Sequence, residues 1–98
     1  MPVPVVSLDA VLQALADPVR LEMVRRLAAA DGDLPCGGLY EDVAKSTASY
    51  HFTLLRESGL LEQYVVGNRK FNHLRTDEVE VVLPGVLTSV LAALAPRP

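Results

Sequence analysis

Hydrophobic residues recur at helical spacing through the first third of the chain, and polar residues mark where each helix begins. Ser7 is a favoured N-cap residue, and the apolar positions that follow predict a first helix through Leu8, Val11, Leu12 and Leu15. The pair Asp17-Pro18 predicts the start of a second helix, because an acid caps the N-terminus and proline suits the first helical position. The expected buried stripe of this second helix is Leu21, Val24, Leu27 and Ala28.

The middle of the chain predicts a loop, a very short helix and a longer helix. Residues 34–38 (LPCGG) form the loop, and residues 39–43 are long enough for barely more than one helical turn. The longer helix runs from about Thr47 to Ser58, with Ser46 as its N-cap and Gly59 at the C′ position. The expected apolar face of this helix is Ala48, Phe52, Leu54 and Leu55.

The last third of the chain predicts a hairpin and a final helix. Residues 61–66 and 69–75 are strand-like, and Gly67-Asn68 is a favoured two-residue turn. Thr76 is expected to cap the final helix, which Pro84-Gly85 must kink or break. Apolar residues three and four positions apart predict a seam for another helix, formed by Val79, Leu83, Val86, Val90 and Leu94.

Composition limits this chain to one small globular domain. It has 98 residues, half of them hydrophobic, so we expect a single domain over 1–98 with frayed ends at 1–6 and 96–98. The single cysteine cannot form an intrachain disulfide and fits a reducing cytoplasm. A chain this short cannot readily bury so many apolar residues within a monomer, and formation of a homodimer is the simplest way to bury the remainder.

Charge is distributed unevenly along the sequence. Residues 1–44 carry a net charge of −4, residues 45–75 carry +3, and residues 76–98 carry −2. A basic middle between acidic ends can form one positive face, which suits nucleic acid.

Several classes of protein are excluded. A secreted protein is not expected, since residues 1–6 show no basic segment or cleavage signal. A membrane-spanning helix is not expected either, since the apolar stretch 79–95 is interrupted and too short. Catalysis is not expected, because Ser49 and His51 lie two positions apart on a helix and point in different directions. Gly37-Gly38 also lacks the residues that follow in a phosphate-binding loop.

The predicted order of elements is that of a winged helix-turn-helix domain, mainly α with a small two-stranded β-wing. A helix fits the DNA major groove, and this one offers small polar side chains from its N-terminal half. Five hydrogen-bonding side chains share its exposed face: Ser46, Thr47, Ser49, Tyr50 and Thr53. Basic residues at the hairpin tip can reach the DNA backbone beside it.

Three stretches of the sequence resemble the ArsR/SmtB-type bacterial transcriptional regulators. Residues 15–21 (LADPVRL) are similar to the opening of that family's second helix, and residues 45–60 (KSTASYHFTLLRESGL) to its recognition helix. Residues 67–70 (GNRK) lie where its wing turns, and the resemblance covers roughly residues 8–94. It implies a cytoplasmic homodimer that binds double-stranded operator DNA with inverted repeats, usually represses, and responds to an effector.

The resemblance and the residue pattern together assign an interface for DNA and one for dimerisation. We expect Thr47, Ser49, Tyr50 and Thr53 to face base edges. Side chains expected to hold phosphates are Lys45, Ser46, His51, Arg56, Arg69 and Lys70. The first and last helices usually form the family's dimer, which assigns to that interface Leu8, Val11, Leu12, Val79, Leu83, Val86, Val90 and Leu94.

The familiar effector sites are incomplete in this sequence. Metal-sensing relatives often carry a Cys-x-Cys pair near the third helix, whereas residues 34–38 hold Cys36 alone. We interpret Cys36 as a small loop residue, with redox or metal sensing as alternatives. His73 could join Asp77 or Glu78 to bind nickel or zinc, although an ordinary strand histidine is the favoured interpretation. A protein–protein interaction module on the same scaffold is the alternative function.

Overall fold

Two capped helices open the described part of the chain, residues 4–5 and 7–95 of the computed structural model. Helix α1 (Leu8–Leu15) begins as predicted, because the Ser7 hydroxyl accepts a hydrogen bond from the Ala10 N–H at 3.3 Å. Helix α2 (Pro18–Ala29) begins at the predicted Asp17, whose carboxylate accepts from the N–H groups of Val19 and Arg20. Both N-cap predictions are therefore confirmed.

The segment after α2 differs from the predicted loop and short helix. Leu34–Pro35 form strand β1, and Cys36–Gly38 form a single 3₁₀ turn, η1. Residues 39–44 bend without forming a helix, so the predicted turn over residues 39–43 is wrong. Asp42 adopts a positive φ of 57°, a conformation that interrupts a right-handed helix.

Helix α3 (Lys45–Glu57) is the predicted longer helix, but it begins two residues early. Ala44 is its N-cap and makes no side-chain cap, so the prediction of a Ser46 cap is wrong. Gly59 follows the helix with a φ of +84°, as expected for a glycine at C′. Leu54 is only half-buried, whereas Ala48, Phe52 and Leu55 are buried.

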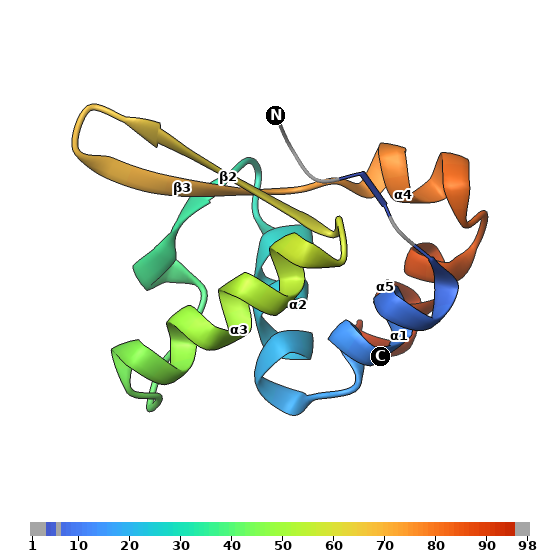
Figure 1. Ribbon diagram of the computed structural model, residues 1–98, viewed down its shortest axis with the longest axis horizontal. Coiled ribbons are helices and arrows are strands. Elements are labelled where there is room, and N and C mark those ends of the chain that lie inside the picture. The colour runs from blue at the N-terminus through green and yellow to red at the C-terminus, as the bar shows by residue number, and fades with distance from the viewer. Residues whose placement is uncertain (1–3, 6, 96–98) are drawn as a thin grey trace.

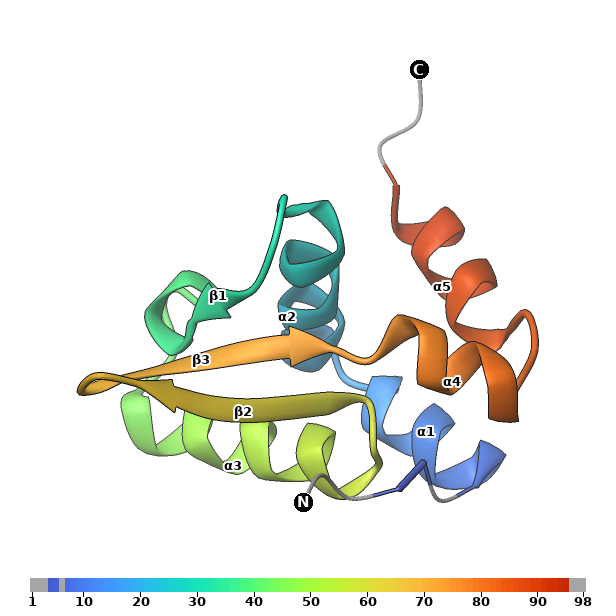
Figure 2. The same ribbon diagram turned by 90° about the horizontal axis from the view of Figure 1, so that it is seen from above.

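The sheet has three antiparallel strands in the order β1-β3-β2. Strands β2 (Leu61–Val66) and β3 (Arg69–Leu74) form the predicted hairpin, paired from Leu61 opposite Leu74 to Val66 opposite Arg69. β1 pairs with the other edge of β3, where Leu34 is opposite Asn72. The hairpin extends beyond the helices as the wing, with α3 along one side of it (Figure 1; Figure 2).

The final helix is divided into two at the predicted break. Helix α4 (Thr76–Val82) ends before Pro84, and helix α5 (Val86–Leu94) begins after Gly85, whose φ is +82°. Arg75 rather than Thr76 occupies the N-cap of α4, so the prediction of a Thr76 cap is wrong. The Glu80 carboxylate accepts from the N–H groups of Gly85 and Thr88, at 2.8 and 3.0 Å, and thereby joins the two helices.

The hydrophobic core draws on every helix and on the sheet. Side chains shielded completely or almost completely from solvent include Val11, Met23, Val24, Leu39, Leu55, Leu60, Val79 and Leu87. On α2 the buried stripe includes Met23, whereas Ala28, which was predicted to be buried, is exposed. Within the described residues, no helix is long and apolar enough to cross a membrane.

Burial corrects two positions of the predicted dimer interface. Val11 and Val79 are fully buried within their own protomer, so they are unavailable to a partner. Leu83, Val86 and Val90 are partly buried and pack against the same core, and Leu94 is half-buried. The expected fraying of 1–6 and 96–98 concerns mostly residues outside those the structure describes, but Val5 packs against the core.

Candidate nucleic-acid interface

The exposed face of α3 carries most of the polar side chains that were predicted to face DNA. Ala48, Phe52 and Leu55 turn into the core, and this fixes the opposite face toward solvent. Ser46, Thr47 and Ser49 are exposed there, and Tyr50 keeps 60% of its surface accessible. The structure therefore places these four predicted residues together on one accessible surface.

The N-terminus of α3 suits a phosphate. The N–H groups of the first helical turn receive no cap from a side chain, and helix N-termini attract anions. Lys45 is the first residue of the helix, and its side chain is exposed. An anion bound here would therefore meet both the positive end of the helix dipole and an ammonium group.

A groove of about 460 Å³ separates α3 from the wing. Lys45, Ser49, Thr53 and Arg56 line it along one stripe of α3, and Lys70 lines it from strand β3. Three cations from two elements thus face one groove, although the whole chain carries a net charge of −3. This local charge is what a DNA backbone requires.

Three of the predicted contact residues, Thr53, Arg56 and Arg69, already contact other side chains of the protein. The Thr53 hydroxyl donates to the Ser49 carbonyl at 3.0 Å and accepts from Arg56 Nη2 at 3.1 Å. Arg69 lies at the wing tip with its guanidinium 5.3 Å from the centre of the Phe71 ring. Thr53 therefore orients Arg56, and Phe71 supports Arg69.

His51 does not belong to the exposed set, and its predicted phosphate contact is not supported. The residue is only 7% exposed, and Arg20 Nη1 lies 2.9 Å from its Nδ1 atom. Arg20 also donates to the carbonyls of Ala14 and Gln13, at 2.6 and 3.3 Å. His51 thus ties α3 to the C-terminal end of α1 through Arg20.

A carboxylate completes this buried connection. Asp17 Oδ2 lies 3.8 Å from His51 Nδ1. Burial raises the pKa of Asp17, but the Arg20 N–H and the charges of His51 and Arg20 act in the other direction and leave it below its usual value. The contacts among Asp17, Arg20 and His51 therefore hold together the start of α2, the end of α1 and the middle of α3.

The expected effector residues do not come together. Cys36 lines the groove, where its Sγ atom lies 3.4 Å from Asn72 Nδ2 and 3.5 Å from Gln63 Nε2. Glu78 forms an ion pair with Arg75, and His73 pairs with Asp33. In residues 4–5 and 7–95, no cluster of three or more His, Cys, Asp or Glu could hold a metal ion.

His73 instead belongs to a network beside the sheet. Its Nδ1 atom lies 2.9 Å from Asp33 Oδ1, and the Tyr64 hydroxyl donates to Asp33 Oδ2 at 2.6 Å. Burial raises the pKa of Asp33, but the hydrogen bonds from Tyr64 and His73 outweigh it and hold the pKa below its usual value. The favoured interpretation of His73 as an ordinary strand histidine agrees with this geometry.

Sequence reasoning missed residues that line the groove, such as Gln63 and Tyr40, and the residue Asn72 that supports Gln63. Asn72 is fully buried, donates to the Leu34 carbonyl at 3.1 Å, and accepts from Gln63 at 2.8 Å. Tyr40 lies edge-on to Phe52 with ring centres 6.1 Å apart. Gln63 and Asn72 could have been found from the sequence, because they are polar residues at facing positions of the predicted hairpin.

Comparison with known proteins identifies the family. The Helix-turn-helix domain family matches residues 15–64, which span α2, β1, η1, α3 and the start of β2. The HTH-type transcriptional regulator YceK of Bacillus subtilis (strain 168) is 38% identical over 82 residues, 82% of each chain.

Solved structures show the same fold. The transcriptional repressor BigR of Xylella fastidiosa superposes with a TM-score of 0.66 at 24% identity, over 91% of this chain and 87% of that one. An ArsR family transcriptional regulator superposes with a TM-score of 0.68 at 22% identity, over 91% of this chain and 98% of the other. The chain therefore belongs to the helix-turn-helix transcriptional regulators and has the winged-helix fold of the ArsR type.

Proposed function

We propose that this protein is a transcriptional regulator, by default a repressor, that binds double-stranded operator DNA in a sequence-specific way. The observation that carries the proposal is the groove between α3 and the wing, where Lys45, Arg56 and Lys70 meet beside the exposed polar ridge of α3. A recognition helix with flanking cations provides both base contacts and phosphate contacts.

The two kinds of contact are assigned to different residues. Thr47, Ser49 and Tyr50 face base edges, because their side chains are short or planar hydrogen-bonding groups on the exposed ridge. The phosphate contacts come from Lys45, Ser46, Arg56, Arg69 and Lys70. Thr53 and His51 act indirectly, since each is hydrogen-bonded to an arginine inside the protein.

The proposed active form is a cytoplasmic homodimer on an operator with inverted repeats. Helices α1 and α4 lie away from the wing tip (Figure 1; Figure 2), and four of their apolar side chains are exposed. They are Leu8, Leu12, Val81 and Val82. A two-fold dimer through this surface would leave both recognition helices free for successive half-sites.

The test is fluorescence anisotropy with the DNA upstream of the chain's own gene, at two salt concentrations. We expect tight binding that falls steeply with salt and is much weaker on a scrambled duplex. Lys45→Ala and Lys70→Ala should each reduce the slope of log K against log salt by about one, because each removes one phosphate contact.

Arg25→Ala is the matched control, because Arg25 is bonded to Glu22 and lies outside the groove. It should leave the salt slope unchanged. Weak binding that ignores sequence at low salt, with no effect of Lys45→Ala or Lys70→Ala, would favour the protein-interaction module instead.

Labelling of Cys36 locates the DNA independently. Cys36 is the only cysteine in the chain and lines the groove. We expect bound operator to slow its alkylation by a maleimide, whereas scrambled DNA should not. An unchanged rate on saturated operator would place the DNA elsewhere on the protein.

A further inference from the structure

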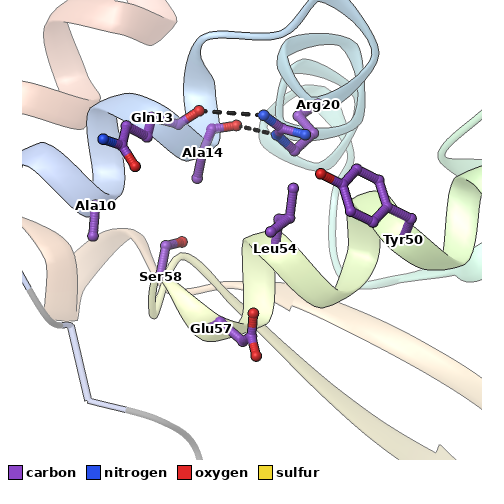
Figure 3. Close-up of a pocket in the computed structure, with 8 residues that line it drawn as sticks. All are labelled: Ala10, Gln13, Ala14, Arg20, Tyr50, Leu54, Glu57 and Ser58. Atoms are coloured by element: carbon purple, nitrogen blue, oxygen red, sulfur yellow. Dashed lines mark hydrogen bonds between the residues drawn. The ribbon is translucent and has the colours of Figure 1, made fainter.

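A second cavity lies on the opposite side of α3 from the groove. It has a volume of about 400 Å³ and opens between α1 and the C-terminal half of α3 (Figure 3). Pockets for small molecules begin at roughly 300 Å³. The function proposed above uses only one residue of this cavity, Tyr50.

The cavity combines an apolar floor with hydrogen-bonding groups at its ends. Ala10 and Ala14 contribute from α1, and Leu54 contributes from α3 (Figure 3). Tyr50, Leu54 and Glu57 are spaced i, i+4 and i+7 and so line one side of α3 over about two turns. An aromatic ring and a carboxylate therefore bracket an apolar strip of about 10 Å.

The charged side chains of the cavity favour a ligand with a positive charge. Arg20 directs its guanidinium to the carbonyls of Gln13 and Ala14 (Figure 3), and its Nη1 atom also contacts His51 Nδ1. Among the residues that the structure describes, the Glu57 carboxylate has neither a hydrogen bond nor an ion pair. The Arg20 guanidinium is thus already hydrogen-bonded within the protein, whereas the Glu57 carboxylate is available to bind a ligand.

The dimer proposed above does not close this cavity. Its α1 residues, Ala10 and Ala14, lie on the side of the helix opposite to Leu8 and Leu12. A partner that packs on Leu8 and Leu12 would therefore leave the cavity open to small molecules.

We propose that this cavity binds a small organic cation with an apolar body, such as an arylalkyl ammonium. The apolar body packs on Leu54, Ala10 and Ala14, and the ammonium group pairs with Glu57. Tyr50 covers the other end through its ring face and its hydroxyl.

Occupancy of the cavity lowers DNA affinity, an effect that rests on the function proposed above. Tyr50 belongs both to the cavity wall and to the exposed ridge that faces DNA. A ligand that holds Tyr50 in the cavity withdraws it from the base edges, so cation and operator oppose each other's binding. By linkage, operator must weaken cation binding by the same factor.

Isothermal titration calorimetry of the full chain with 2-phenylethylammonium, without DNA, tests the site. We expect saturable binding, and Glu57→Gln should weaken it about tenfold because the charge pair is lost. Asp77→Asn is the matched control, since Asp77 is an exposed acid outside the cavity, and it should bind like the native chain. The anion 3-phenylpropionate, of similar size, should not bind.

Three results would overturn the site: no heat of binding at millimolar cation, equal affinity in Glu57→Gln, or equal affinity for the anion. A circular dichroism spectrum and melting temperature for Glu57→Gln check that the variant is folded.

Anisotropy with operator and saturating cation then tests the regulatory role. A several-fold loss of DNA affinity in the native chain, absent in Glu57→Gln, supports it. Binding of the cation with unchanged DNA affinity would overturn the regulatory role. Failure to bind any DNA would overturn the proposed function, while the calorimetric result would still decide the cavity.

Discussion

Gly59 controls how α3 leads into the sheet. Its φ of +84° lies in the left-handed region, which side chains with a Cβ enter only at a cost in free energy. A Cβ added at this position would also lie 2.6 Å from Val5 Cα and 2.8 Å from the Pro4 carbonyl oxygen. The N-terminal segment therefore crosses directly over the end of the recognition helix.

The substitution Gly59→Ala should destabilise the fold by about 2 kcal/mol or more, because backbone strain and overpacking add together. Urea denaturation measures the change in the free energy of unfolding. Gly67→Ala is the matched control: its φ is +64°, but apart from its chain neighbours no described residue lies within 4 Å of an added Cβ. Equal losses in the two variants would show that the close approach of Val5 contributes nothing.

Residue roles were predictable where sequence position alone determines them. Ser7, Asp17 and Gly59 follow local capping rules and hold the places that were predicted. His51 was misassigned because its burial depends on Arg20, which lies 31 positions earlier in the chain. The sequence pattern around His51 gives no indication of a contact with a residue so far away in the chain.

At the scale of elements, α2 carries a charge network on its outer face. Glu22 pairs with Arg25 at 2.7 Å and with Arg26 at 2.8 Å, and Arg26 reaches Glu41 at 3.0 Å. Hydrogen bonds from Arg25 and then Arg26 lower the pKa of Glu22 from 4.5 to about 2. These arginines therefore serve α2 and its neighbouring loop, away from the groove.

The Glu22 network should make stability depend on pH in a defined window. A lowered carboxyl pKa stabilises the fold above the unfolded value near 4.5, and this contribution is lost as the pH falls toward 2. Because these side chains are well exposed, Glu22→Gln should cost only about 0.5–1 kcal/mol at pH 7. Thermal unfolding from pH 7 to pH 2.5 measures the difference from the native chain.

That difference should shrink through the window and nearly vanish at its lower end. Glu57→Gln is the control, since Glu57 forms no ion pair within the described residues and its substitution should show no such trend. A gap between Glu22→Gln and the native chain that stays constant with pH would exclude the network as its source.

Elements were predicted well where periodicity was long and poorly where it was short. The two long helices, the hairpin and the break at Pro84-Gly85 follow from spacing and turn residues. β1 was missed because a two-residue strand has no periodicity, and it exists only through pairing with β3. The short helix was wrong because residues 39–43 are too few to offset the cost of helix nucleation.

On the scale of the whole molecule, exposed apolar side chains lie on α1 and α4 and also on the wing, where Val65 and Val66 are 62% and 59% exposed. Leu8 and Leu12 on α1 are 47% and 46% exposed, and Val81 on α4 is 82% exposed. The basic groove lies toward the wing. Sequence periodicity predicted a dimer surface that included Val11 and Val79. Because these two side chains are buried in the core, the exposed apolar residues that remain for such a surface on α1 and α4 are Leu8, Leu12, Val81 and Val82.

Charge placed on this surface should separate the protomers. We expect Leu12→Glu to shift the chain from dimer to monomer in sedimentation velocity, since a buried unpaired carboxylate opposes association. Thr47→Glu is the control, because Thr47 is exposed and belongs to α3, not to α1 or α4. Thr88→Glu would be unsuitable, because Thr88 is hydrogen-bonded to Glu80. A dimer that persists in Leu12→Glu at micromolar concentration would place the interface elsewhere.

The sequence separation between the two-residue strand β1 and its partner β3 leads to an expectation about the order of folding. The β2–β3 hairpin closes through a two-residue turn, and such local pairing takes roughly microseconds. β1 joins β3 through contacts 38 positions apart, and the loop that this closes contains all of α3. Loop closure is unfavourable until Asn72 and Leu34 pair, so we expect it late. Before this pairing the wing and the recognition helix can form, while the groove between them lacks the wall that Cys36 and Tyr40 provide.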